Sequence, residues 1–260
     1  MMRKKKKIKS KRSKTSWTRV LLRFVQVLVV LLLIGVFGYF FVDYTRESTE
    51  FNVRNIQING LQHLSQEEIF EVTQIDPNDN VLYLDVDLIK KKLEELSYIK
   101  SCEVTQIFPD TVNIDIVERV PFASLHLNSR AYAIDNEGVI LSEYDSSELP
   151  MPPFITLTRE IDFVDLGEQI TTDSLATTIE ILTHLKATPL TNDLTIAEMA
   201  IQTKDEIIMI CEELDYEIRW GFSSPKNQVD RWNVYWLTNK SHPPCLEYLD
   251  LRFEPDLVCK

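Results

Sequence analysis

The sequence is poor in glycine, with six in 260 residues, which disfavours the glycine-rich loops that bind nucleotide phosphates. It also lacks the patterns GxSxG, HExxH, GxxxxGK[ST] and GxGxxG, which mark hydrolase, zinc and nucleotide sites. An SxxK pattern, typical of penicillin-binding enzymes, occurs at Ser97 and Lys100. We expect a helix to end at Leu96 and Lys100 to enter a strand, so that the two side chains point apart. We therefore predict no enzymatic activity, no catalytic residues and no cofactor.

Closely spaced metal ligands are also missing. The chain has four cysteines without a CxxC pair, and its four histidines are far apart in sequence. A zinc site normally needs closer pairs of ligands, so we predict no metal site. The cysteines are Cys102, Cys211, Cys245 and Cys259. Four cysteines allow three pairings, and the sequence leaves open whether they pair or stay free.

Acidic residues are absent from one end of the chain. Residues 1–23 contain eleven lysines and arginines and no acid, whereas the rest has seventeen basic against forty acidic residues, a net charge of −23. Such a split indicates two environments for two parts of one molecule.

A long apolar run, residues 24–42, follows the basic segment, and Gln26 is its one strongly polar side chain. A helix of about 19 residues spans roughly 28 Å, close to the hydrocarbon thickness of a bilayer. The run is longer than a signal-peptide core and does not end in small residues, so we predict a retained transmembrane helix. The basic segment then stays in the cytoplasm as a tail beside anionic lipid, and residues 43–260 lie outside.

Residues 51–121 show the order strand, helix, helix, strand, strand. An extended apolar stretch ends at Asn59-Gly60, and Ser65 with Glu68 forms a capping box at the start of a helix. A second amphipathic helix is expected over residues 85–96, and alternating strands over residues 99–108 and 111–119. The pattern predicts a small α+β domain.

Residues 122–260 favour a second domain of short strands with two helices. We expect strands at residues 123–127, 131–134, 139–142, 154–157, 194–202, 206–211 and 216–220, and helices at residues 172–185 and 225–237. The predicted fold class is α+β: a transmembrane helix, a β-α-α-β-β domain, and a mixed, mainly antiparallel sheet with flanking helices.

Several segments together resemble one family. The passages NVRNIQINGLQHLSQEEI and YIKSCEVTQIFPDTVNIDIVER resemble a POTRA domain (polypeptide-transport-associated module), and YEIRWG, VDRWNVYW and LEYLDLRFEPDLVCK resemble the β domain that follows it in the bacterial division proteins FtsQ/DivIB. The resemblance covers residues 20–260, although the usual glycine-rich continuation of ELPMPPFITL is missing. It implies a divisome scaffold with a tail at 1–23, a membrane helix at 24–42, a POTRA domain at 51–121 and a C-terminal β domain at 122–260.

The last predicted strand, residues 246–253 with a continuation at 257–258, is the candidate binding element. An edge strand offers unpaired N–H and C=O groups to which a partner strand can add. The residues alone favour a strand that completes the sheet and its core; the resemblance instead implies that it receives FtsB, which pairs with FtsL. The predicted partner-binding residues are Trp232, Trp236, Leu249, Leu251, Arg252, Phe253, Glu254, Pro255 and Leu257.

Other partners follow from the same resemblance. We expect further divisome membrane proteins to contact the POTRA domain or the anchor helix, the strand at residues 53–58 to be a second docking edge or a targeting element, and the protein to gather at the division septum. We expect no nucleic acid and no small-molecule substrate. Two alternatives stay open: a POTRA-containing adaptor for envelope assembly or polypeptide transport, and an anchored hydrolase, for which no residues were found.

Overall fold

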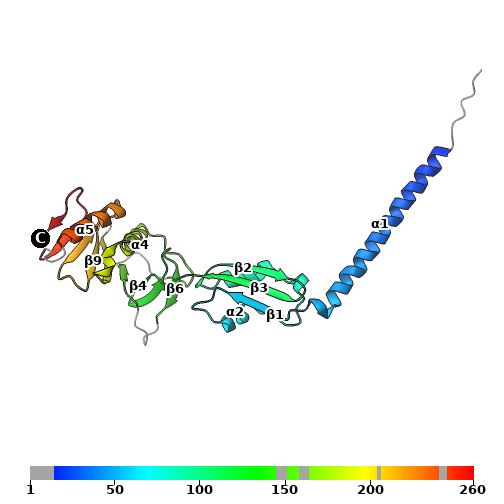
Figure 1. Ribbon diagram of the computed structural model, residues 1–260, viewed down its shortest axis with the longest axis horizontal. Coiled ribbons are helices and arrows are strands. Elements are labelled where there is room, and N and C mark those ends of the chain that lie inside the picture. Colours follow the sequence, from blue (N-terminus) through cyan, green and yellow to red (C-terminus); the bar gives the residue numbers. More distant parts are fainter. Residues whose placement is uncertain (1–14, 145–150, 158–163, 204–205, 240–244) are drawn as a thin grey trace, which may run out of the picture. The chain divides into compact units, whose positions relative to one another are not determined.

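The computed structural model describes residues 15–144, 151–157, 164–203, 206–239 and 245–260. Figure 1 shows the order of its elements. The chain forms two compact units: one holds the segments up to Ile56, Asp76–Leu84 and Gln106–Val112, and the other holds Gln57–Ile75, Asp85–Thr105 and Asn113–Lys260. Part of the predicted cytoplasmic tail, residues 1–14, lies outside the described residues.

The first unit begins with helix α1 (Thr15–Glu47). Within the described chain, Arg19–Glu47 is the one helix long and apolar enough to cross a membrane, with a mean hydropathy of 2.8 and no buried residue in its most apolar stretch. The end of α1 is fixed to the turn η2 (Val81–Tyr83). Thr45 is buried, its hydroxyl lies 2.8 Å from the Tyr83 hydroxyl, and Asn80 donates to the Thr45 carbonyl at 2.8 Å.

The predicted β-α-α-β-β order is confirmed. Its elements are β1 (Asn55–Asn59), α2 (Gln66–Thr73), α3 (Val86–Glu94), β2 (Ile99–Ile107) and β3 (Thr111–Glu118). The sheet order is β1-β3-β2, so that β1 and β2 are its edges. The capping box of Ser65 and Glu68 is present at the start of α2.

Gly60 follows β1 in a conformation that requires glycine. Its φ is +90°, and a Cβ there would collide with the Ile116 carbonyl of β3. A side chain at this position would therefore be strained by its backbone angle and blocked by the neighbouring strand.

The remaining residues build a nine-stranded sheet in the order β12-β11-β10-β9-β8-β7-β4-β5-β6. Its strands are β4 (Ala123–Leu127), β5 (Arg130–Ile134), β6 (Ile140–Glu143), β7 (Phe154–Leu157), β8 (Ile196–Thr203), β9 (Glu206–Cys211), β10 (Glu217–Trp220), β11 (Tyr248–Asp250) and β12 (Val258–Cys259). Most neighbours are antiparallel, but β4–β7, β7–β8 and β10–β11 are parallel. The predicted α+β class and mixed sheet are confirmed.

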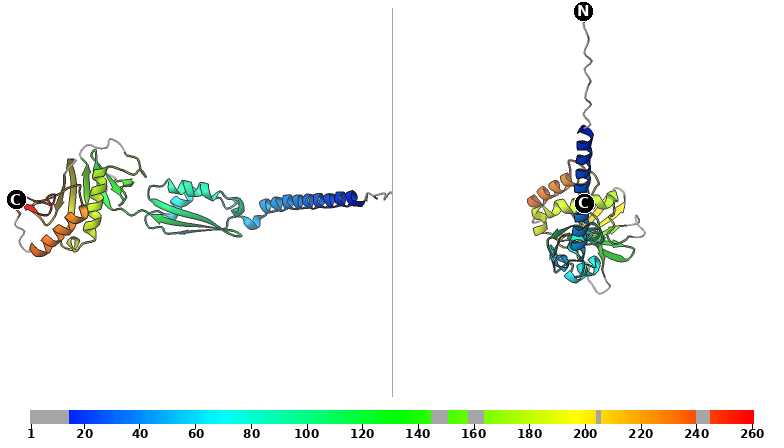
Figure 2. Two further views of the ribbon diagram at one scale, coloured as in Figure 1. Left: turned by 90° about the horizontal axis from the view of Figure 1, so that it is seen from above. Right: turned by 90° about the vertical axis from the view of Figure 1, so that its right-hand side faces the viewer.

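Two helices, α4 (Asp173–Lys186) and α5 (Pro225–Asn239), pack side by side on this sheet (Figures 1 and 2). The core between helices and sheet contains Ile155, Ile181, Met209, Trp220 and Trp232, all at most 1% exposed. Because alternate strand residues point to the same face, this single layer of helices explains the burial of Met199 and Ile201 on β8 and of Ile207, Met209 and Cys211 on β9.

The prediction for the end of the chain is wrong in one respect. Residues 246–253 and 257–258 do not form one outermost strand with a continuation. The strand is three residues long, β11, and the chain then turns back so that β12 pairs antiparallel with its outer side. The chain leaves the strand conformation after Asp250, and Pro255, which has no N–H for a ladder, lies in the turn that follows.

Candidate partner-binding edge

The end of the nine-stranded sheet is built around β11. On one side β11 pairs in parallel with β10, in the register Ile218↔Leu249. Two further backbone bonds extend this ladder: the Glu217 N–H donates to the Glu247 carbonyl at 3.2 Å, and the Leu251 N–H donates to the Arg219 carbonyl at 2.9 Å. The strand thus offers a ladder from residue 247 to residue 251.

The other side of β11 is covered by residues 252–260, which we name the C-terminal strap. The strap carbonyl of Lys260 accepts the N–H groups of Leu246 and Glu247, both at 2.7 Å, and its own N–H donates to the Tyr248 carbonyl at 3.1 Å. The outermost backbone at this end of the sheet is therefore β12, not β11.

A disulfide joins Cys245, before β11, to Cys259 in β12, with Cα atoms 5.1 Å apart. The remaining two cysteines, Cys102 and Cys211, are buried and free. The cross-link closes a loop of 14 residues, and a loop of this size constrains the unfolded chain by about 3 kcal/mol in the chain-entropy model. The pairing that the sequence left open is thus one that ties the strap to β11.

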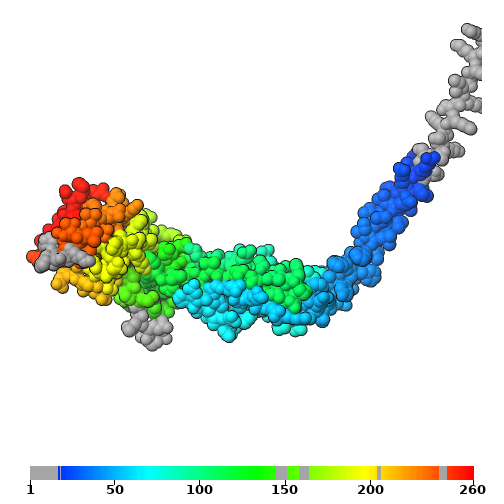
Figure 3. Space-filling model, viewed as in Figure 1, coloured from blue at the N-terminus to red at the C-terminus, as the bar shows by residue number. Residues whose placement is uncertain are grey.

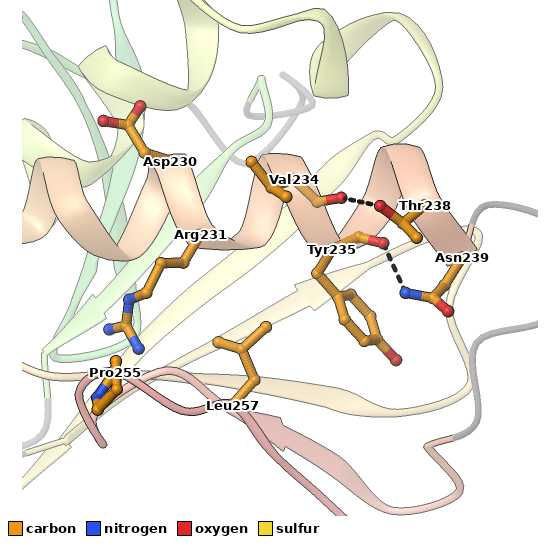
Figure 4. A pocket seen from close by; sticks show the side chains of 8 residues that line it. All are labelled: Asp230, Arg231, Val234, Tyr235, Thr238, Asn239, Pro255 and Leu257. Atoms are coloured by element: carbon orange, nitrogen blue, oxygen red, sulfur yellow. Dashed lines mark hydrogen bonds between the residues drawn. The ribbon is translucent and has the colours of Figure 1, made fainter.

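Arg231 on α5 holds the first part of the strap. One terminal nitrogen of its guanidinium donates to the carbonyls of Phe253 and Asp256, each at 3.0 Å, and the other donates to the Leu251 carbonyl at 2.6 Å. A guanidinium presents its donors in a fixed fork, so that one side chain can bind three carbonyls of a turning chain. Figure 4 shows Arg231 pointing from α5 towards the strap beside Pro255.

A groove of about 420 Å³ lies between α5 and the strap. Tyr235 and Arg231 point into it from the helix, and the Leu257 side chain reaches towards them from the strap (Figure 4). The space-filling view shows the strap, in red, at the surface beside α5, in orange (Figure 3). Leu257 is half-buried and packs against the main core, which makes it the apolar anchor of the strap.

A buried carboxylate fixes the turn between β11 and the strap. Asp250 is 2% exposed, and its carboxylate accepts three hydrogen bonds from the guanidinium of Arg252, at 3.0, 3.2 and 2.6 Å. Burial alone would raise the pKa of Asp250, but the hydrogen bonds from Arg252 outweigh it and hold the pKa below its usual value. Glu206 on β9 contacts the same guanidinium at 3.1 Å, so that the turn is tied to the strand beyond β10.

The nine predicted partner-binding residues divide into two groups. Four are core residues: Trp232, Trp236, Leu249 and Leu251. Five belong to the strap: Arg252 and Leu257 are half-buried, whereas Phe253, Glu254 and Pro255 are exposed. Their burial leaves the core residues no surface to offer in this structure, so that the contact surface at this end consists of the strap and of exposed residues beside it.

Two features of this site were not anticipated, the strap and the role of Arg231, and the pairing of Cys245 with Cys259 was left open. The signal for the disulfide was present, because Cys245 and Cys259 flank the last apolar–polar alternation of the chain. Arg231 gave no signal, because its partners are backbone carbonyls and these carry no sequence information.

The SxxK pair does not form a site. Helix α3 ends before Ser97 and β2 begins before Lys100, as expected. The Ser97 hydroxyl donates to the Leu141 carbonyl, whereas the Lys100 ammonium pairs with Glu137 at 2.7 Å. Both residues thus contact the β5–β6 region.

Comparison with known proteins identifies the segment before this sheet. Residues 51–119 match the family model described as "POTRA domain, FtsQ-type". "Cell division protein FtsQ" of Koribacter versatilis (strain Ellin345) is 27% identical over 258 residues, which are 95% of this chain and 71% of that protein. These matches support the FtsQ/DivIB family for this chain. The FtsQ of Zymomonas mobilis subsp. mobilis is 30% identical over 118 residues, or 45% of this chain and 37% of that protein. The FtsQ of Syntrophotalea carbinolica is 21% identical over 213 residues, which cover 82% and 75% of the two chains.

Proposed function

We propose that this protein is a non-enzymatic scaffold of the bacterial division machinery. In this proposal α1 anchors it in the cell membrane with a cytoplasmic basic tail, and the POTRA domain and the nine-stranded sheet act outside. The FtsQ-type POTRA domain and the relatives named as division proteins support the assignment. The division into a tail at residues 1–23, a membrane helix at 24–42, a POTRA domain at 51–121 and a C-terminal β domain at 122–260 is part of this proposal.

The partner surface in this proposal is the β11–β12 end of the sheet. The observation that carries it is the outer flank of β11, which among the described residues pairs only with the two-residue strand β12 and its neighbour Lys260. A sheet end of this kind accepts an extended segment from another chain by main-chain hydrogen bonds. The partners proposed are FtsB-like and FtsL-like division proteins, and recruitment takes place at the septum.

A pair of matched substitutions tests this surface. Phe253 in the strap is 54% exposed, and Leu88 on α3 is 50% exposed, so that Phe253→Asp and Leu88→Asp place the same charge at equally exposed sites. We expect Phe253→Asp to reduce co-purification with FtsB-like and FtsL-like proteins at least tenfold and Leu88→Asp to leave it unchanged. Full recovery by a folded Phe253→Asp protein would contradict the proposed surface.

The POTRA sheet supports a second docking edge. Strand β1 is an outer strand of the three-stranded sheet, and we propose that it binds another divisome membrane protein or directs the protein to the septum. A chain lacking residues 51–121, labelled at its amino end, should lose its septal position. Septal fluorescence of this chain would contradict the targeting role.

The alternative function is an adaptor for envelope assembly or polypeptide transport, which uses the POTRA fold to hold extended chains. The two edges of the POTRA sheet would serve that role equally well. Fluorescence of the full chain distinguishes the two functions, because a division protein gathers at midcell and a transport adaptor distributes evenly around the envelope.

A further inference from the structure

The strap occupies the position that a docking strand would take on β11. We infer that the Cys245–Cys259 disulfide is a redox-controlled lock: while it is closed, the strap covers the outer side of β11, and when it is reduced, β12 leaves and the strand becomes free for a partner. This inference rests on the proposed function, because it concerns the control of the same end of the sheet.

The first argument is the length of the two possible docking edges. Strand β12 consists of Val258 and Cys259, and a strand so short is a poor template for strand addition. The outer flank of β11 is paired from Leu246 to Asp250, with residues 258–260 of the strap. A partner strand would form a longer ladder of backbone hydrogen bonds on β11 than on β12. The strap occupies that flank of β11.

The second argument is the weakness of the other contacts of β12. The ion pair between Lys260 and Glu247 has a distance of 2.7 Å, but the side chains are 62% and 59% exposed, and exposed pairs stabilise a fold little. The three hydrogen bonds from Arg231 hold residues 251–256, which precede β12. Apart from its backbone hydrogen bonds to residues 246–250, the disulfide is the constraint on β12, and it is the covalent one, while Arg231 would keep the start of the strap in place as a hinge.

The third argument is access. Cys259 is exposed and Cys245 is 5% exposed, so that an external thiolate reaches the sulfur of Cys259. Attack there forms a mixed disulfide with Cys259 and releases Cys245 as a thiolate, which takes a proton from water. The second thiol of a dithiol oxidoreductase then displaces Cys259. The chain gains two electrons and two protons, and the oxidoreductase is left as a disulfide.

The lock is selective, because it is the chain's one disulfide. Burial raises the pKa of the Cys211 thiol to about 12 and raises the pKa of Cys102, and both residues are buried. A reductant therefore cleaves the Cys245–Cys259 bond. The two other thiols that an oxidant could attack are buried and protonated.

The test measures hydrogen exchange of the full chain in detergent micelles, with the disulfide closed and after treatment with dithiothreitol. We expect the amides of Leu246 and Glu247, which donate to Lys260, to exchange at least tenfold faster after reduction, while those of β9 stay unchanged. A Cys245→Ser/Cys259→Ser variant should behave as the reduced chain under both conditions. A Cys102→Ala/Cys211→Ala variant, as the matched control, should keep the full response to the reductant. Equal protection of Leu246 and Glu247 in both states would overturn the inference.

Partner binding separates the lock from the proposed function. An FtsB-like segment should be recovered at least tenfold more by the reduced chain and by the double serine variant than by the oxidised chain. Equal recovery by the oxidised and reduced chains would overturn the lock and leave the proposed function standing. Faster exchange on reduction without recovery by either chain would support the lock and contradict the proposed partner surface.

Discussion

A buried carboxylate, Glu118, holds the loop that leads into α2. Its two oxygens accept the backbone N–H groups of Gln62, His63 and Leu64, at 2.9, 2.7 and 3.2 Å. Its side chain is 1% exposed. Burial alone would raise the pKa of Glu118, but these three bonds outweigh it and keep the pKa below the usual value of 4.5. One side chain at the end of β3 thus fixes the entry to a helix more than fifty residues earlier in the chain.

This geometry gives a pH prediction. Because the pKa of Glu118 is lower in the folded state than in the unfolded state, its contribution is fully present above pH 4.5, and it is lost as the pH falls through the folded value. Glu118→Gln should lower the free energy of unfolding by about 1–3 kcal/mol at pH 7, because the amide leaves buried donors unsatisfied. Urea unfolding in micelles at pH 7 and at pH 4 measures both effects.

The control for this prediction is Glu103→Gln. Glu103 lies on β2 and is exposed, so that Glu103→Gln removes the same charge without changing a contact to buried N–H groups. An equal loss of stability in both variants, or a Glu118→Gln protein with the same acid sensitivity as the original chain, would show that the N–H contacts of Glu118 are unimportant.

At the scale of the element, the strap depends on one guanidinium. Arg231→Lys keeps the charge but loses the fork that binds the carbonyls of Leu251, Phe253 and Asp256. We expect local opening of the strap to become easier by about 1–3 kcal/mol, seen as faster hydrogen exchange in residues 252–258 of the oxidised chain. Arg130→Lys is the control, because the Arg130 side chain is 63% exposed and makes a 3.4 Å contact with Glu143. If hydrogen exchange in the strap were unchanged by Arg231→Lys, the disulfide and not Arg231 would hold the strap in place.

The elements of the fold were largely predictable, whereas the site was predictable only in part. The capping box of Ser65 and Glu68 and the alternation of β3 are local signals, and the structure places α2 and β3 where they indicate. The alternation around β11 was also informative, because Leu249 and Leu251 are both fully buried. Alternation assigns side chains to faces of a sheet, but it does not say which strand pairs on the free flank. The pairing of β12 on that flank depends on the reversal of the chain after β11 and on the disulfide, which are properties of the tertiary structure.

At the scale of the whole molecule, the charge asymmetry sets the proposed orientation in the membrane. Replacing six of the seven lysines of the basic segment by glutamine should weaken the retention of the amino end in the cytoplasm, because lysine and arginine beside an apolar helix determine its direction. The lysines to replace are Lys4, Lys5, Lys6, Lys7, Lys9 and Lys11. Protease added to intact spheroplasts should then cleave residues 43–260 in a smaller fraction of chains. The same six lysines replaced by arginine form the control, which should keep the original fraction, and a glutamine variant that also keeps it would contradict the proposed cause of orientation.

The backbone of Lys260 is hydrogen-bonded to Leu246, Glu247 and Tyr248, and this has a practical consequence for any reporter or purification handle. Sequence appended after Lys260 would emerge at the rim where a guest polypeptide is proposed to settle, and it would act there as a competitor. Tags placed before α1 do not reach this end of the sheet. Comparing partner binding with the tag at either position would therefore show how strongly an added C-terminal segment competes there.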